Sequence, residues 1–229
     1  MRKIQRLAAV GAMAALTAGV VACSTAQGPA TGGQATSEVP SPSAQAAPSP
    51  GEAAGAGVTK ISDIFGPACG QLPTEGPGSA QGMVEEPVAT AASHNPLLTT
   101  LTKAITAAKL GDTLNSAPAL TVFAPADSAF KEWETKNPGL INKLTTAPDA
   151  AQPTSTLYKI LTYHVVGERY DAAGIVKAGT LDSLEGGKLK IGGTAAAPTV
   201  NEAPVLCGNI PTKNATVFVI GQVLSPPAT

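Results

Sequence analysis

The chain has 229 residues, of which only 14% are charged and 3% aromatic. Its formal net charge of −1 leaves no basic surface to neutralise phosphates, so nucleic-acid binding is not expected. Two histidines and three cysteines, without CxxC or HxxxH spacing, give no basis for a metal site, and we expect neither metal nor cofactor. The 24 glycines and 20 prolines exceed an average share, which predicts a low-complexity segment beside a folded core.

The N-terminus has the pattern of a bacterial export signal. Three basic residues among the first six precede an apolar run over 7–21, which is short for a membrane span. The run ends in Val-Val-Ala-Cys, which resembles a lipobox. Residues 1–22 are therefore predicted to be a lipoprotein signal peptide and Cys23 the lipid-attachment site. The alternative is an ordinary signal peptide with a cysteine there by chance.

A low-complexity segment follows the predicted lipidation site. Residues 24–57 are rich in Ala, Gly, Pro, Ser and Thr and contain no aromatic or basic residue. Such a sequence cannot bury enough apolar surface to offset the entropy of ordering it. Residues 23–57 are therefore predicted to be a lipidated cysteine followed by a disordered linker. Ser and Thr beside Pro and Ala also resemble O-glycosylated stalks, which leaves a glycosylated linker as an alternative.

The remaining residues, 58–229, are predicted to form one folded domain. All phenylalanine, tyrosine and tryptophan residues lie in this part of the chain. Cys69 and Cys207 are the cysteines left after Cys23. Because exported chains fold in oxidising surroundings, the pair is predicted to form a disulfide that joins the two ends of the domain. Two free thiols are the alternative.

Hydrophobic periodicity predicts helices mostly first and antiparallel hairpins mostly last, which is an α+β pattern. Helices are predicted from 85–87 to 95, over 97–108 with Gly111 as a stop, after 125–127, over 155–161 and over 171–177. Strands are predicted over 119–123, 162–166, 181–184, 188–191, 199–200, 205–207 and 217–224.

Three ordered blocks of this sequence resemble the fasciclin (FAS1) domain family. Residues 121–130 (TVFAPADSAF) resemble its first signature, 161–166 (LTYHVV) its tyrosine–histidine motif, and 217–226 (VFVIGQVLSP) its closing block. The resemblance extends from about 61 to 227. It implies a single FAS1 domain in which helices pack on antiparallel β-sheet. Residues 82–93, the two cysteines and the lipobox further resemble the lipid-anchored and secreted fasciclin antigens of mycobacteria.

Two positions depart from the family pattern. Ala126 replaces a usual Thr or Ser and removes a hydroxyl that could cap the following helix, a role for which Asp127 remains available. Gly221 replaces a usual Asp, so any polar contact of that carboxylate is absent here.

The tyrosine–histidine motif supplies the candidate functional residues. In the fasciclin family this motif is implicated in adhesion to integrin-type receptors, which makes Tyr163 and His164 the candidate adhesion residues. In the predicted strand the two side chains would point to opposite faces, so one would point inward. Their apolar neighbours favour a core role, with the imidazole hydrogen-bonded. The sequon Asn214-Ala215-Thr216 is taken as incidental in a bacterial lipoprotein.

The motifs favour a binding protein over an enzyme. No GxSxG, GxxxxGK[ST] or HExxH pattern occurs, so catalysis is not predicted. The leading hypothesis is a monomeric cell-adhesion module, held to the outer face of the cell membrane by its lipid alone. Its partner would be a protein receptor, the extracellular matrix or the cell envelope. The alternatives are a lipoprotein that binds a small apolar ligand between sheet and helices, and a structural envelope protein.

Replacing Cys23 by Ser tests the anchor. Lipid is attached through the cysteine thiol, so the variant should no longer incorporate radiolabelled palmitate in its native host, whereas the parent protein should. Continued labelling of the variant would contradict the predicted lipobox.

Overall fold

A computed structural model describes residues 57–227 of the chain. The predicted signal peptide, the lipid site Cys23 and the predicted linker up to residue 56 lie outside the described residues. Among the residues described, none of the helices has the length and apolar character needed to cross a bilayer.

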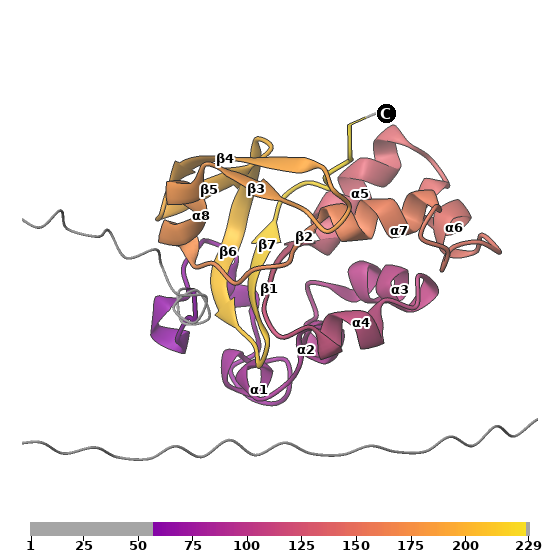
Figure 1. Cartoon of the computed structure of the whole chain (residues 1–229). Coiled ribbons are helices and arrows are strands. Elements are labelled where there is room, and N and C mark those ends of the chain that lie inside the picture. The colour runs from indigo at the N-terminus through magenta and orange to yellow at the C-terminus, as the bar shows by residue number, and fades with distance from the viewer. Residues whose placement is uncertain (1–56, 228–229) are drawn as a thin grey trace, which may run out of the picture. The chain divides into compact units, whose positions relative to one another are not determined.

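The structure is α+β, as predicted, with most helices before most strands (Figure 1). Two 3-10 turns and seven α-helices precede the second strand: η1 (Ile61–Asp63), η2 (Cys69–Gln71), α1 (Ala80–Val84), α2 (Val88–His94), α3 (Thr99–Ala107), α4 (Gly111–Ser116), α5 (Asp127–Lys136), α6 (Leu140–Thr145) and α7 (Thr156–Tyr163). A further helix, α8 (Ala172–Ala178), follows that strand. In Figure 1, α3 to α7 lie on one side of the central strands and α8 on the other.

The strands form one seven-stranded sheet in the order β2-β1-β7-β6-β5-β4-β3. Their bounds are β1 (Leu120–Pro125), β2 (Val165–Val166), β3 (Thr180–Asp182), β4 (Lys188–Thr194), β5 (Ala197–Val200), β6 (Ala203–Pro211) and β7 (Ala215–Ile220). The sheet is mixed and not purely antiparallel as expected, because β1 and β7 pair in parallel. A parallel pair needs a long connection, which here holds most of the other elements.

The two ends of the sheet are joined. Val166 of β2 forms an antiparallel bridge with Ser183, which directly follows β3. Beside it, the Leu184 N–H donates to the Val165 carbonyl at 2.7 Å. The sheet therefore closes on itself in a barrel-like arrangement, which leaves its end strands with few unpaired backbone groups.

The β1–β7 pair separates two hydrophobic cores. Both strands are buried along their whole length. Because side chains alternate along a strand, Val122 and Val217 face a core shared with α1 to α7, whereas Phe123 and Phe218 face the interior of the closed sheet. The two phenylalanine rings pack with their centroids 5.6 Å apart.

The N-terminal part of the domain is fastened to β6. Phe65 and Gly208 exchange two main-chain hydrogen bonds, and the Ala68 N–H donates to the Leu206 carbonyl at 2.9 Å. The predicted disulfide between Cys69 and Cys207 is present directly beside these contacts. It links positions 138 residues apart, so it ties the beginning of the domain to one of its last strands.

Several predicted elements need correction. The strand predicted over 162–166 is shorter: helix α7 extends to Tyr163, His164 caps it, and only Val165–Val166 are extended. Gly111 begins α4 and does not end the preceding helix, since Lys109 adopts the positive φ of 52° after α3. Five short elements, η1, η2, α1, α4 and α6, were not predicted, because segments of three to six residues carry too little periodicity.

Asn214, which precedes β7, joins the ends of two helices. Its Oδ1 accepts the N–H of Val88, the first residue of α2, at 2.9 Å. Its Nδ2 donates to the carbonyls of Leu114 and Ala117, at the end of α4, at 2.8 Å each. Helix ends leave such groups without partners inside the helix. The buried amide of this sequon therefore has a structural role.

Replacing Asn214 by Ala should lower the free energy of unfolding by about 3 kcal/mol, because it leaves buried groups of α2 and α4 without partners. Urea unfolding measures the change. Asn142→Ala, at an exposed position of α6, is the control and should change stability by less than about 0.5 kcal/mol. Similar losses for the two variants would contradict the assigned role.

Candidate functional site

The structure places the predicted site residues in two regions. Cys69 and Cys207 form the disulfide at the N-terminal end of the domain. Tyr163 and His164 lie at the C-terminal end of α7, where the chain turns into β2. Their side chains are 2% and 3% exposed, so both are buried. The candidate site is therefore the region around this buried pair and the surfaces that it supports.

The imidazole of His164 links α7 to the segment after β7. Its Nδ1 lies 2.7 Å from the carbonyl of Ile160, one helical turn earlier. Its Nε2 accepts the N–H of Leu224 at 3.0 Å. This pattern requires the neutral tautomer with the proton on Nδ1, because a carbonyl can only accept and an N–H can only donate. Both ring nitrogens are therefore satisfied.

Burial keeps this ring neutral. Loss of hydration disfavours the imidazolium and lowers the pKa of His164 to about 4, although the hydrogen bond to Ile160 acts in the opposite direction. A protonated ring would also lose its bond with Leu224, because Nε2 would then carry a proton. The side chain is suited to a structural link and not to proton transfer near neutral pH.

Tyr163 links α7 to the hairpins at the other end of the sheet. Its ring packs inside the closed sheet. Its hydroxyl donates to the carbonyl of Lys188 in β4 at 3.0 Å and accepts the Nδ2–H of Asn201 at 2.9 Å. Tyr163 and His164 thus point to opposite sides, as predicted, but they do so from a helix end and not from a strand.

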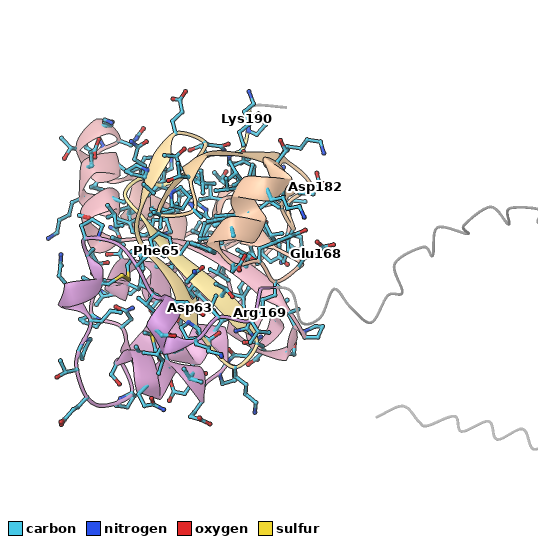
Figure 2. The ribbon with its side chains drawn as sticks, turned by 90° about the vertical axis from the view of Figure 1, so that its left-hand side faces the viewer. Asp63, Phe65, Glu168, Arg169, Asp182 and Lys190 are labelled. Atoms are coloured by element: carbon cyan, nitrogen blue, oxygen red, sulfur yellow. A yellow bond between two sulfur atoms is a disulfide. The ribbon has the colours of Figure 1, made fainter. Side chains whose placement is uncertain are left out.

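An open groove lies above Tyr163. It encloses about 510 Å³ between β4, β5, the turn that follows β5, and the C-terminal residues Ser225 and Pro227. Tyr163 contributes to its lining, and Lys190 and Glu202 are exposed at its edge. Figure 2 shows the Lys190 side chain projecting away from the domain. Among the described residues, Lys190 forms no ion pair, whereas the neighbouring Lys188 contacts Asp182 at 2.7 Å.

The turn at the edge of this groove has an unusual conformation. Asn201 and Glu202 form the two-residue connection between β5 and β6, with φ values of 45° and 69°. Positive φ at both positions is typical of a type I′ turn, for which Asn-Gly is preferred. Glu202 therefore adopts a backbone conformation that costs a non-glycine residue about 1–2 kcal/mol.

Asn201 secures that turn. Its Oδ1 accepts the N–H of Lys190 at 2.8 Å, and its own N–H donates to the carbonyl of the same residue at 2.8 Å. The sequence does not predict this turn, because Asn-Glu lacks the glycine by which such turns are recognised.

A cavity of about 130 Å³ lies on the His164 side, between α3, α4, α7 and β1. Its walls are mainly apolar, with Leu101, Ile105 and Phe123 among them. Its volume is close to that of cavities that take up small apolar molecules, which makes the cavity a second candidate site.

Asp127 acts differently from the prediction. The helix that it begins, α5, has Ala126 at its N-cap and no side-chain cap. The Asp127 carboxylate instead accepts the N–H of Thr100 at 2.8 Å and the hydroxyl of Thr99 at 2.6 Å, at the start of α3. Burial tends to raise the pKa of Asp127, but these hydrogen bonds outweigh it and hold the pKa below its usual value. The residue thus caps a neighbouring helix.

Within residues 57–227, no group of three or more His, Cys, Asp or Glu side chains is placed to hold a metal ion.

Replacing His164 by Gln should flatten the pH dependence of stability. The unfolded chain binds a proton near pH 6.5, whereas the native ring stays neutral until about pH 4, so protonation favours unfolding over this window. The parent protein should lose about 2 kcal/mol between pH 7 and pH 5 from this residue. The measurement is urea unfolding at both pH values, and His94→Gln, at an exposed position, is the control. Equal pH dependence in the parent protein and His164→Gln would contradict the assignment.

Comparisons with known proteins agree with this architecture. The Fasciclin domain family model matches residues 96–226. The chain is 42% identical over 175 residues to the immunogenic protein MPB70 of Mycobacterium bovis, covering 72% of this chain and 84% of that protein. It is 41% identical over 174 residues to the cell surface glycolipoprotein MPB83 of the same species, covering 72% and 74%.

A solved structure has the same fold. It is the FAS1 domain pair from the insect cell adhesion molecule Fasciclin I, which superposes with a TM-score of 0.53 at 18% identity. The match covers 65% of this chain and 52% of the insect chain, so it spans about half of that pair. From the family match and the identity to the mycobacterial proteins, the chain belongs to the fasciclin family.

Proposed function

We propose that this protein is an exported adhesion module that binds a protein partner outside the cell. The observation that carries the proposal is its membership of the fasciclin family, together with its similarity to mycobacterial proteins described as immunogenic and as cell-surface glycolipoproteins. This family is generally of adhesion type and not enzymatic, which supports binding over catalysis. The disulfide suits an oxidising, extracellular location.

In this proposal, a lipid on Cys23 holds the protein at the outer face of the cell membrane, and the segment that follows acts as a tether. The sequence supports this arrangement through the basic start, the apolar run and the cysteine at its end. The domain would then be presented as a monomer at a distance from the lipid. Contact with a receptor, matrix or envelope protein would be made by the domain surface.

The groove above Tyr163 is the proposed contact surface. Since Tyr163 and His164 are buried, they would act by positioning this surface and not by touching the partner. Tyr163 holds both the β4 backbone and Asn201. The unfavourable backbone of Glu202 supports a functional role, because such conformations are often found at binding sites.

Two substitutions separate binding from stability. Glu202→Gly should stabilise the domain by up to about 1 kcal/mol, since glycine accepts positive φ, while removing a carboxylate from the groove. Lys190→Glu should leave stability within about 0.5 kcal/mol of the parent protein. Both are expected to weaken attachment to the partner about tenfold.

Surface plasmon resonance with immobilised fibronectin, laminin and collagen, combined with urea unfolding, measures both effects. Lys131→Glu, which makes the same charge change at an exposed position of α5, should bind like the parent protein. Equal binding by Lys190→Glu and Lys131→Glu would show that the groove is not the contact surface. Failure of the parent protein to bind any of the three matrix proteins would contradict adhesion to the matrix.

A further inference from the structure

The geometry points to a site for the end of a linear hydrocarbon chain in the cavity beside His164. This inference goes beyond partner binding: the cavity and the groove above Tyr163 have no lining residue in common. The ligand class is a lipid or long-chain alcohol whose apolar end enters the domain while its polar head stays outside.

The buried lining of the cavity favours an apolar ligand group. The polar side-chain groups of its buried lining residues are already engaged: both His164 ring nitrogens are bonded, and the Thr162 hydroxyl donates to the Tyr158 carbonyl at 2.8 Å. With His164 neutral, none of the residues that line the cavity carries a charge. A water molecule needs two to four polar partners, which the buried part of the lining does not offer.

The size and surroundings of the cavity favour a chain over a rigid ring. At about 130 Å³ it is close to cavities that take up benzene, but two smaller voids of about 20 Å³ adjoin it. All three voids are lined in part by Leu101. Protein interiors seldom leave several such voids around one side chain. Rotation of Leu101 would extend the space, and a flexible alkyl chain can follow it.

The cavity has an entrance with both apolar and polar groups. Its lining residues that are not buried are Thr113 of α4, Tyr158 of α7 and Leu184 after β3. Leu184 is 49% exposed, which is unusual for a large aliphatic side chain in this domain. The hydroxyls of Thr113 and Tyr158 are available beside it for an uncharged polar head.

Binding of straight-chain alcohols from butanol to decanol to the full-length protein tests the inference. Isothermal titration calorimetry should give one saturable site, with affinity rising up to about fourfold per methylene until the cavity is full. Thr113→Trp should block the entrance and weaken octanol binding at least tenfold. Thr135→Trp, at an exposed threonine of α5, should bind octanol like the parent protein.

Intermolecular NMR contacts provide a readout that does not depend on the variants. Octanol protons should show nuclear Overhauser effects to the methyl groups of Leu101 and Ile105. Absence of saturable binding, contacts elsewhere, or equal affinities of the two tryptophan variants would overturn the inference. Because the probes are alcohols and no partner protein is present, this outcome is independent of whether the domain mediates adhesion.

Discussion

The parallel pairing of β1 with β7 is the constraint on which the rest of the domain depends. Six residues of each strand are in register, and both strands are buried on both faces. A strand pair that is buried on both faces needs other elements to pack apolar side chains against each face. The helices α1 to α7 provide it on one side, and the closed sheet with α8 provides it on the other. The segment before β1, with α1 to α4, and the segment between the two strands therefore supply the two covers together.

Tyr163 and His164 lie where these two halves meet. The His164 carbonyl accepts the N–H of Phe123 in β1, while its ring holds the segment after β7. The Tyr163 ring enters the other core and its hydroxyl reaches β4 and Asn201. The motif thus connects the central strands to the groove on one side and to the cavity on the other.

The sequence predicts the α+β class, the family, the disulfide and the approximate position of most elements, because long periodic segments and the three blocks carry that information. It does not predict the parallel β1–β7 pair, since strand direction depends on partners distant in sequence. Its β-branched residues favour a strand at Tyr163 and His164, whereas the helix in fact continues to Tyr163. The Asn201-Glu202 turn and the cavity arise from tertiary contacts and left no local signal.

The tautomer and titration of His164 test most directly the claim that this motif acts as an internal link. Nitrogen-15 NMR of the imidazole across pH 3.5 to 8 reports both. We expect a proton on Nδ1, an unprotonated Nε2 that accepts the Leu224 N–H at neutral pH, and a midpoint near pH 4. A midpoint near 6.5 with rapid tautomer exchange, as for a solvent-exposed histidine, would contradict it.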